Sequence, residues 1–183
     1  KKDTTQSPSI LAWRKYRKNK LGMLATAFIV VFALIAIFAY HLIPDATPNA
    51  NRQLLELSTQ KPGFETDMLL LPKEKAPERQ TFFKTLMHGR PDNFTYLPYD
   101  SLQIGAAQTT VYLFNPEHSV TPMVQIIDNV DIAGKRFEQQ SEAETFILNQ
   151  RTKHQKFLLG TDQFGRDFLS RLVLGSRISR SVG

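Results

Sequence analysis

The side chains that could support catalysis or metal binding are few and widely spaced in this sequence. The four histidines, His41, His88, His118 and His154, do not stand at metal-ligand spacing from one another, and the chain contains no cysteine. We therefore expect each histidine to be solvated or to cap a helix. Without cysteine, the fold also has no disulfide to stabilise it.

The carboxylates offer no clear acid and base pair. Glu142 and Glu144 lie on a polar run, and Asp128 and Asp131 flank a predicted turn, so both pairs are typical of solvated surface. The Ala-Gly-Lys run at 133–135 lacks the earlier glycine and the following Ser or Thr of a phosphate-binding loop. We predict no enzyme, no cofactor and no metal site.

The strongest pattern is an apolar stretch at 21–43 without a single Asp, Glu, Lys or Arg. As one helix its 23 residues would reach roughly 35 Å, slightly more than a bilayer's hydrocarbon core of about 30 Å. The alternative, a buried helix of a soluble protein, would need other elements on every side. The run is too long for the apolar region of a signal peptide, and bulky residues follow it. We predict a transmembrane helix at 21–43.

Charge is distributed unevenly around this stretch. Residues 1–43 carry seven basic residues and one acidic residue, a net of +6, whereas residues 44–155 carry a net of −3 and residues 156–183 a net of +3. Basic residues before a span favour the cytoplasmic side. We expect a cytoplasmic N-terminus, residues 44 onward outside, and anionic lipid rather than nucleic acid against the basic segment.

The first twenty residues form a basic segment that we expect in the cytoplasmic headgroup layer. Ser7 and Pro8 resemble a helix start, with Ser7 as the N-cap and Pro8 in the first turn. The alternative is a disordered basic flank. The residues predicted at the membrane interface are Trp13, Arg14, Tyr16, Arg17, Lys18, Lys20 and, at the other end of the span, Tyr40.

Residues 44–155 predict a small α+β or mainly β external domain. Two prolines and turn-forming residues at 44–49 end the preceding helix. The runs at 109–114 and 123–127 predict strands, 68–71 is a further short apolar run, 81–88 predicts a short helix ended by Gly89, and another helix can begin at Ser141.

The last segment, residues 156–183, mixes glycines, carboxylates and arginines. We expect Thr161 and Asp162 to cap a turn, Gly165 to allow a close backbone approach, and an amphipathic helix to begin at about Arg166. We predict an ion pair between Asp167 and Arg171, which stand four residues apart. The apolar side of this helix is formed by Phe164, Phe168, Leu169, Leu172 and Val173.

This last segment resembles the signature of the second permease subunit of dipeptide and oligopeptide ABC transporters, which leads from the external side into the second membrane helix. The stretch at 13–20, Trp-Arg-Lys-Tyr-Arg-Lys-Asn-Lys, is similar to the family's start before its first span. The matching positions of the signature are Leu159, Gly160, Thr161, Asp162, Gly165, Arg166, Asp167, Leu169, Ser170, Arg171, Leu172, Gly175, Arg177, Ser179, Val182 and Gly183.

The sequence departs from the family in three places. Phe157 and Leu158 stand where His-Pro is usual, Arg180 replaces an apolar residue, and the external segment is longer than the typical linker. The resemblance implies a structural role for the ten signature residues Gly160, Thr161, Asp162, Gly165, Arg166, Asp167, Ser170, Arg171, Gly175 and Arg177.

The resemblance implies a membrane α-helical subunit in a bacterial inner membrane. Its implied partners are a second permease, two cytoplasmic ATPases that bind the ATP, and an extracytoplasmic solute-binding protein. The family's later helices and ATPase-docking loop are not among residues 1–183, so we expect an N-terminal part of a permease. We expect the signature to be an external interfacial helix that orients the second span. The alternative is that Asp162 or Asp167 contacts solute.

A second class of function stays open at this point. A single-span anchored external sensor or interaction module would have the same first span and external domain. An apolar span of about 20 residues after Gly183 would favour the permease.

Overall fold

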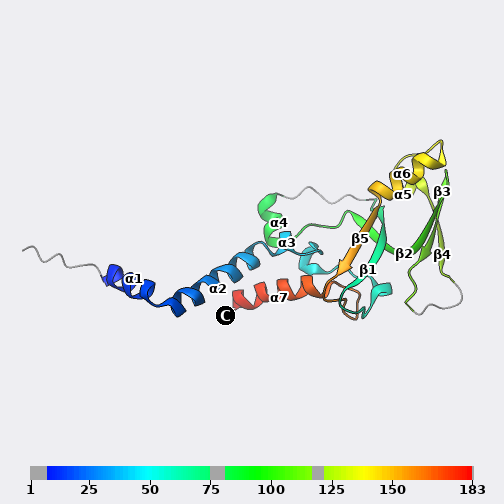
Figure 1. The fold of residues 1–183 in the computed structure, drawn as a ribbon. Helices are drawn as coiled ribbons and strands as arrows, with labels where there is room; N and C mark the ends of the chain where they lie inside the picture. Colours follow the sequence, from blue (N-terminus) through cyan, green and yellow to red (C-terminus); the bar gives the residue numbers. More distant parts are fainter. Residues whose placement is uncertain (1–7, 75–80, 117–121, 183) are drawn as a thin grey trace, which may run out of the picture.

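A computed structural model describes residues 8–74, 81–116 and 122–182 of the chain (Figure 1). It begins with two successive helices, α1 (Pro8–Lys18) and α2 (Lys20–Ile37). Asn19 separates them, because its extended backbone ends one helix and its side chain accepts a hydrogen bond from the Gly22 amide at 3.0 Å. The predicted helix start at Pro8 is confirmed, whereas Ser7 lies outside the described residues.

Helix α2 is the one helix within the described ranges that is long and apolar enough to cross a membrane. Its 18 residues rise about 27 Å, close to the thickness of a hydrocarbon core. The prediction of a single helix over 21–43 is wrong at its end. The chain turns at Phe38, and a separate short helix, α3 (Ala39–Leu42), follows.

The reason for this break is packing. Ala39, Tyr40 and Ile43 are buried against Leu174, which comes from the other end of the chain. Hydrophobicity alone does not distinguish side chains that face lipid from side chains that face protein. The predicted span therefore included six residues, 38–43, that lie beyond the end of α2.

After two 3₁₀ turns, η1 (Pro48–Ala50) and η2 (Leu55–Leu57), the chain builds a five-stranded antiparallel sheet in the order β4-β3-β2-β1-β5. The strands are β1 (Phe64–Pro72), β2 (Phe94–Ile104), β3 (Gln108–Leu113), β4 (Val124–Asp128) and β5 (Thr152–Phe157). This arrangement fits the predicted α+β class. The strands predicted at 109–114 and 123–127 are confirmed as β3 and β4, and the apolar run at 68–71 lies within β1.

Helices α5 (Asn129–Ala133) and α6 (Gln140–Gln150) supply the core of the sheet. Ile132 of α5 and Ile147 of α6 are fully buried together with Leu69 of β1 and Val111 of β3. A fully buried aliphatic side chain contributes about 1.5–3 kcal/mol, so this cluster dominates the stability of the external part. The helix predicted from Ser141 is confirmed as α6.

The sheet is inserted between two points of the chain that lie side by side. Its first and last strands pair with each other, Phe64 lies opposite Phe157, and the Gly63 amide donates to the Phe157 carbonyl at 2.9 Å. A domain whose ends meet can be inserted into a chain without separating the segments on either side. The segments before Gly63 and after Phe157 therefore remain neighbours.

Two helices connect the sheet to the apolar helices. Helix α4 (Phe82–His88), predicted at 81–88, ends at Gly89 as expected and lies beside α3. Helix α7 (Phe168–Val182) starts near the sheet and runs back beside α2 (Figure 1). The amphipathic helix predicted from about Arg166 therefore exists, begins at Phe168 and lies beside α2.

Candidate functional site: the junction between the span and the signature segment

Residues 45–60 and 159–177 fold against each other between the apolar helices and the sheet, and we call these two segments the junction. Its centre is the carboxylate of Asp45, whose exposed fraction is 1%. The chain reaches Asp45 directly after α3 and Pro44, where no helix continues. A buried carboxylate must be satisfied by donors, and the local turns supply them.

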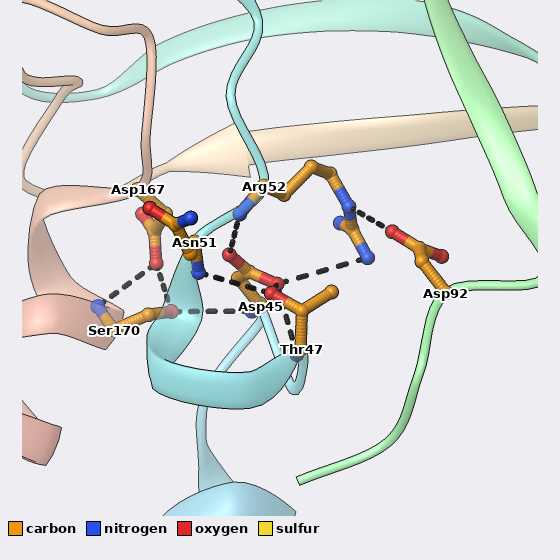
Figure 2. Close-up of polar contacts among 7 residues, drawn as sticks. All are labelled: Asp45, Thr47, Asn51, Arg52, Asp92, Asp167 and Ser170. Carbon is orange, nitrogen blue, oxygen red and sulfur yellow. Dashed lines mark hydrogen bonds and ion pairs between the residues drawn. The ribbon is translucent and has the colours of Figure 1, made fainter.

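Asp45 accepts hydrogen bonds from three groups (Figure 2). The Thr47 amide donates at 3.1 Å and the Thr47 hydroxyl at 2.7 Å to Oδ1, and the Arg52 amide donates at 3.1 Å to Oδ2. The Arg52 guanidinium lies 3.8 Å from Oδ1 and pairs more closely with Asp92, at 2.8 Å. One buried carboxylate thus organises the turn, and Asp92 links that turn to the segment before β2.

Asp45 also reaches the signature segment through its backbone. Its amide donates to the Ser170 hydroxyl oxygen at 3.1 Å. The Ser170 hydroxyl donates in turn to Asp167 Oδ2, which also accepts from the Ser170 amide at 2.9 Å. The first turn of α7 is therefore joined to the end of α3 by a chain of hydrogen bonds that is almost entirely buried.

The predicted ion pair between Asp167 and Arg171 is wrong. Asp167 precedes α7 and binds the amide three residues later, which is the geometry of an N-cap. Arg171 instead donates to Asp162 Oδ2 at 2.8 Å. Asp167 and Arg171 do stand four residues apart, but a carboxylate at a helix start is stabilised more by the unpaired amides of the first turn.

Asp162 forms the second polar centre. Its side chain accepts from the amides of Phe164 at 2.9 Å and Arg166 at 3.0 Å, and from the Arg166 guanidinium at 2.8 Å. Burial acts most strongly and raises the pKa of Asp162, but the Arg166 and Phe164 hydrogen bonds together outweigh it and leave this pKa below its ordinary value of 3.8. Asp162 and Arg166 are engaged within the turn, as the capping prediction required.

The backbones of the two segments touch at Gly165 and around Thr161. Thr161 accepts from the Gln60 amide at 2.8 Å and donates to the Leu57 carbonyl oxygen. Gly165 has φ +68°, and a Cβ atom there would lie 1.6 Å from the Leu54 carbonyl oxygen. Only glycine fits at this position, which confirms the predicted close approach. Gly160 is similarly placed, with φ +72° and a Cβ position 2.2 Å from the Gln60 carbonyl oxygen.

The far end of the junction joins α7 to α3 and α4. The Arg177 guanidinium lies 5.6 Å from the centre of the Tyr40 ring and donates to the Leu86 carbonyl oxygen at 3.0 Å. Tyr40, predicted at the lipid interface, is instead buried and accepts a hydrogen bond from the Asn49 amide at 3.2 Å. Gly175, in contrast, is exposed, and a Cβ there would meet no atom within 4 Å.

The other predicted interface residues lie on α1 and at the start of α2. Trp13 is exposed, and its ring stacks on Tyr16 with centroids 5.5 Å apart. The basic residues predicted there all have exposed side chains: Arg14, Arg17, Lys18 and Lys20. This arrangement suits a basic helix before a span.

A cleft of about 370 Å³ lies beside Asp45, lined in part by Arg52, Lys73, Asp92 and Tyr96. The Arg52 guanidinium sits 3.8 Å from the centre of the Tyr96 ring. Burial raises the pKa of Tyr96 to about 12, against the opposing effect of Arg52. The Arg52 guanidinium already pairs with two carboxylates, so its charge is not available to bind an anionic ligand in this cleft.

The histidines and carboxylates singled out in the sequence are not gathered into one centre. Within 8–74, 81–116 and 122–182, no group of three His, Cys, Asp or Glu side chains could hold a metal ion. His154 lies on the exposed surface beside Asp67 and Glu65, and the Asp67 hydrogen bond raises its pKa above 6.5. His118 lies outside the described residues.

Sequence reasoning missed the first half of the junction. From the sequence, Asp45 was assigned only to a helix-ending turn, and Arg52 and Asp92 were not singled out. The available signal was weak: an Asp-x-Thr run directly after an apolar helix is typical of a side-chain turn, but it does not reveal a partner more than a hundred residues away.

Comparison with known protein families gives a match in the N-terminal part of the chain. Residues 7–62 match the family described as the N-terminal TM domain of oligopeptide transport permease C. No curated protein and no solved structure matches the chain. The match confirms the resemblance to this type of permease in its N-terminal portion. It indicates a membrane location and part of an oligopeptide ABC permease, a transporter family rather than an enzyme family.

Proposed function

We propose that this chain, whose residues 7–62 match the N-terminal TM domain of oligopeptide transport permease C, is the N-terminal part of an ATP-driven permease subunit for dipeptides, oligopeptides or similar solutes. Its implied partners are a second permease, two ATPases that bind ATP, and an extracytoplasmic solute-binding protein. The chain itself would bind no cofactor.

The observation that carries this proposal is where the family match ends. It stops at residue 62, two residues before β1 begins at Phe64. The signature-like segment resumes after β5 and packs on the matched region, through the Asp45 amide and the Leu54 carbonyl among others. This supports a permease start in which an external domain is inserted at about 63–158 between two parts of one unit.

The charge pattern supports the orientation in this proposal. The basic residues of α1 precede the span, which favours a cytoplasmic N-terminus; in this orientation the junction and the sheet would lie on the external face of a bacterial inner membrane. The domains are then a basic interfacial segment, a span centred on α2, an external insert, and a signature segment whose helix α7 heads back along α2 towards the bilayer.

In this proposal the junction is a structural brace. The Asp167 carboxylate accepts a hydrogen bond from the Ser170 amide in the first turn of α7, and the Ser170 hydroxyl oxygen accepts one from the Asp45 amide just after α3. A backbone donor left unsatisfied near lipid costs several kcal/mol, so a helix returning to the membrane needs such a cap. Asp162 and the Oδ2 atom of Asp167 accept hydrogen bonds within the junction, and Asp167 is buried, which favours bracing over contact with solute.

The test is an uptake experiment with the full-length gene product in its own cells. Asp45→Ala is compared with Asp100→Ala, an exposed carboxylate of β2, as the matched control. We expect Asp45→Ala to reduce both co-purification with an ATPase subunit and uptake of a labelled peptide, while Asp100→Ala changes neither. If a deletion strain takes up peptides at the wild-type rate and no ATPase co-purifies, the proposed function is wrong.

A further inference from the structure

Helix α4 presents an apolar surface that the sheet and the junction leave largely uncovered. Phe82, Phe83 and Met87 are 57%, 73% and 58% exposed. Phe83 and Met87 stand four residues apart and therefore share one face of the helix. Exposed aromatic side chains concentrated on a single turn mark a contact surface rather than ordinary solvated surface.

The position of α4 next to α3 determines how deep this surface lies relative to the bilayer that α2 would span. The Phe82 ring lies 5.6 Å from the ring of His41, on α3. His41 follows the last residue of α2 by four positions, and because the chain turns at Phe38 it lies at most about 6 Å beyond α2 along the axis of that helix. The headgroup layer on each side of a bilayer is roughly 5–8 Å thick, so α4 lies at its depth when α2 spans the hydrocarbon core. Figure 1 shows α4 beside α3 at that end of α2.

Further exposed apolar side chains lie at the end of the span, on and next to α3, which neighbours α4. Phe38 is 43% exposed and Leu42 is 63% exposed, and both follow directly on the apolar surface of α2. The charged residues within 81–90 are Lys84 and Arg90, without any Asp or Glu. Aromatic rings with flanking basic residues are typical of segments in the headgroup layer of anionic lipid.

Contacts on the opposite side hold α4 in this orientation. Thr85 is buried, Arg177 donates to the Leu86 carbonyl oxygen, and the Arg90 amide donates to the Ala46 carbonyl oxygen at 2.7 Å. At Gly89 a Cβ atom would lie 2.7 Å from the Tyr40 ring, so the helix end is pressed against α3. These contacts leave the Phe82 and Phe83 rings exposed, whereas Met87 lies at the edge of the apolar face next to α7, where its sulfur accepts a hydrogen bond from the Arg177 guanidinium at 3.3 Å.

We propose that α4 is a membrane anchor that inserts Phe83 and Met87 into the external headgroup layer of the bilayer. The external domain then contacts the membrane twice, through α2 and through α4. A second contact restricts rotation of the domain about the axis of α2, which a single helix would permit. The junction transmits this restraint to α7 through Arg177.

Depth-dependent quenching of a fluorescent label tests this proposal, because the chain has no native cysteine. Phe83→Cys, Met87→Cys and Ile126→Cys are each labelled with an environment-sensitive dye. The labelled chains are reconstituted into nanodiscs of phosphatidylcholine and phosphatidylglycerol that carry nitroxide groups near the headgroup or near the chain end. Ile126 is the matched control, because it is 64% exposed on β4, at the edge of the sheet far from α2 (Figure 1).

We expect the shallow nitroxide to lower emission at positions 83 and 87 roughly two-fold, and more than the deep nitroxide does, since interfacial helices insert about 5–10 Å. Position 126 should respond to neither. Phe32→Cys, in the middle of α2, should respond most to the deep nitroxide.

Two results would overturn the proposal. If quenching at position 83 equals that at position 126, α4 does not touch lipid, and its surface is left for a protein partner. If the deep nitroxide quenches position 83 more than the shallow one, α4 lies inside the hydrocarbon core and is not an interfacial anchor. A matching thermal midpoint for each labelled chain establishes that the label has not unfolded it.

Discussion

Replacing Asp45 with alanine should destabilise the junction more than any surface change. The substitution removes the acceptor of three donors: the Thr47 amide, the Thr47 hydroxyl and the Arg52 amide. It also removes one of the two carboxylates beside the Arg52 guanidinium, which keeps Asp92 as its closer partner.

The size of the effect follows from these contacts. Hydrogen bonds to a charged acceptor contribute about 1.5–3 kcal/mol each, and losses within one network are not additive. Because Asp92 still pairs with Arg52, we place the loss at about 3–4 kcal/mol, the lower part of the range for breaking a buried ion pair. For a chain of this size that corresponds to roughly 6–16 °C in the thermal midpoint.

The assay is thermal unfolding of the purified chain in nanodiscs, followed by near-ultraviolet circular dichroism. Asp100→Ala serves as the control, and it should change stability by less than about 0.5 kcal/mol because Asp100 is exposed. A midpoint for Asp45→Ala within 2 °C or so of that control would refute the view that Asp45 organises the junction.

Three further predictions address backbone fit, titration and topology. Gly165→Ala should cost about 2–4 kcal/mol, because alanine is strained at φ +68° and would collide with the Leu54 carbonyl oxygen, whereas Gly175→Ala, on an open helix face, should be neutral or stabilising by up to about 1 kcal/mol in the same assay. His154 has a pKa raised by its Asp67 hydrogen bond, so its contribution to stability is complete below pH 6.5 and is lost as pH rises through the higher pKa of the folded state. The stability difference between wild type and His154→Gln should therefore be larger at about pH 5 than at about pH 9. Single cysteines at Ser9 and Glu56, both exposed, should react with an impermeant maleimide in intact spheroplasts at position 56 and not at position 9.

Each of these has a result that would count against it. Equal effects of alanine at the two glycines would mean that the backbone approach at Gly165 is looser than the structure shows. A stability difference for His154→Gln that grows with pH would contradict the Asp67 contact. Labelling at position 9 alone would reverse the proposed orientation.

The sequence predicted the elements with strong local signals. The apolar helix, the strands β3 and β4, the glycine-ended helix α4 and the start of α6 all have clear local patterns of hydrophobicity or turn residues. Strands β2 and β5 lacked such a pattern. β2 includes a proline and several polar residues, and β5 is mostly polar because its outward side chains form surface ion pairs, such as Lys156 with Glu65.

The junction could be predicted only on its C-terminal side. Gly165 and Asp162 have local roles in a tight turn, and such roles are visible in sequence. The partners of that turn, Asp45 and Leu54, are brought to it by a sheet inserted between them, which no local pattern encodes. Long-range packing likewise decided that Tyr40 lies inside the fold and not in lipid.

The most direct test of the account is cross-linking of the two halves of the junction in the full-length transporter. Asn51 accepts a hydrogen bond from Arg166 at 3.1 Å, so cysteines at these two positions can be bridged by a short bifunctional thiosulfonate. Cysteines at Gln53 and Gln125 form the control pair, because Gln125 lies on the far strand β4. We predict efficient cross-linking of the 51 and 166 pair in native membranes and none of the control. Equal, low cross-linking of both pairs would contradict the claim that the signature segment folds onto the segment that follows the first span.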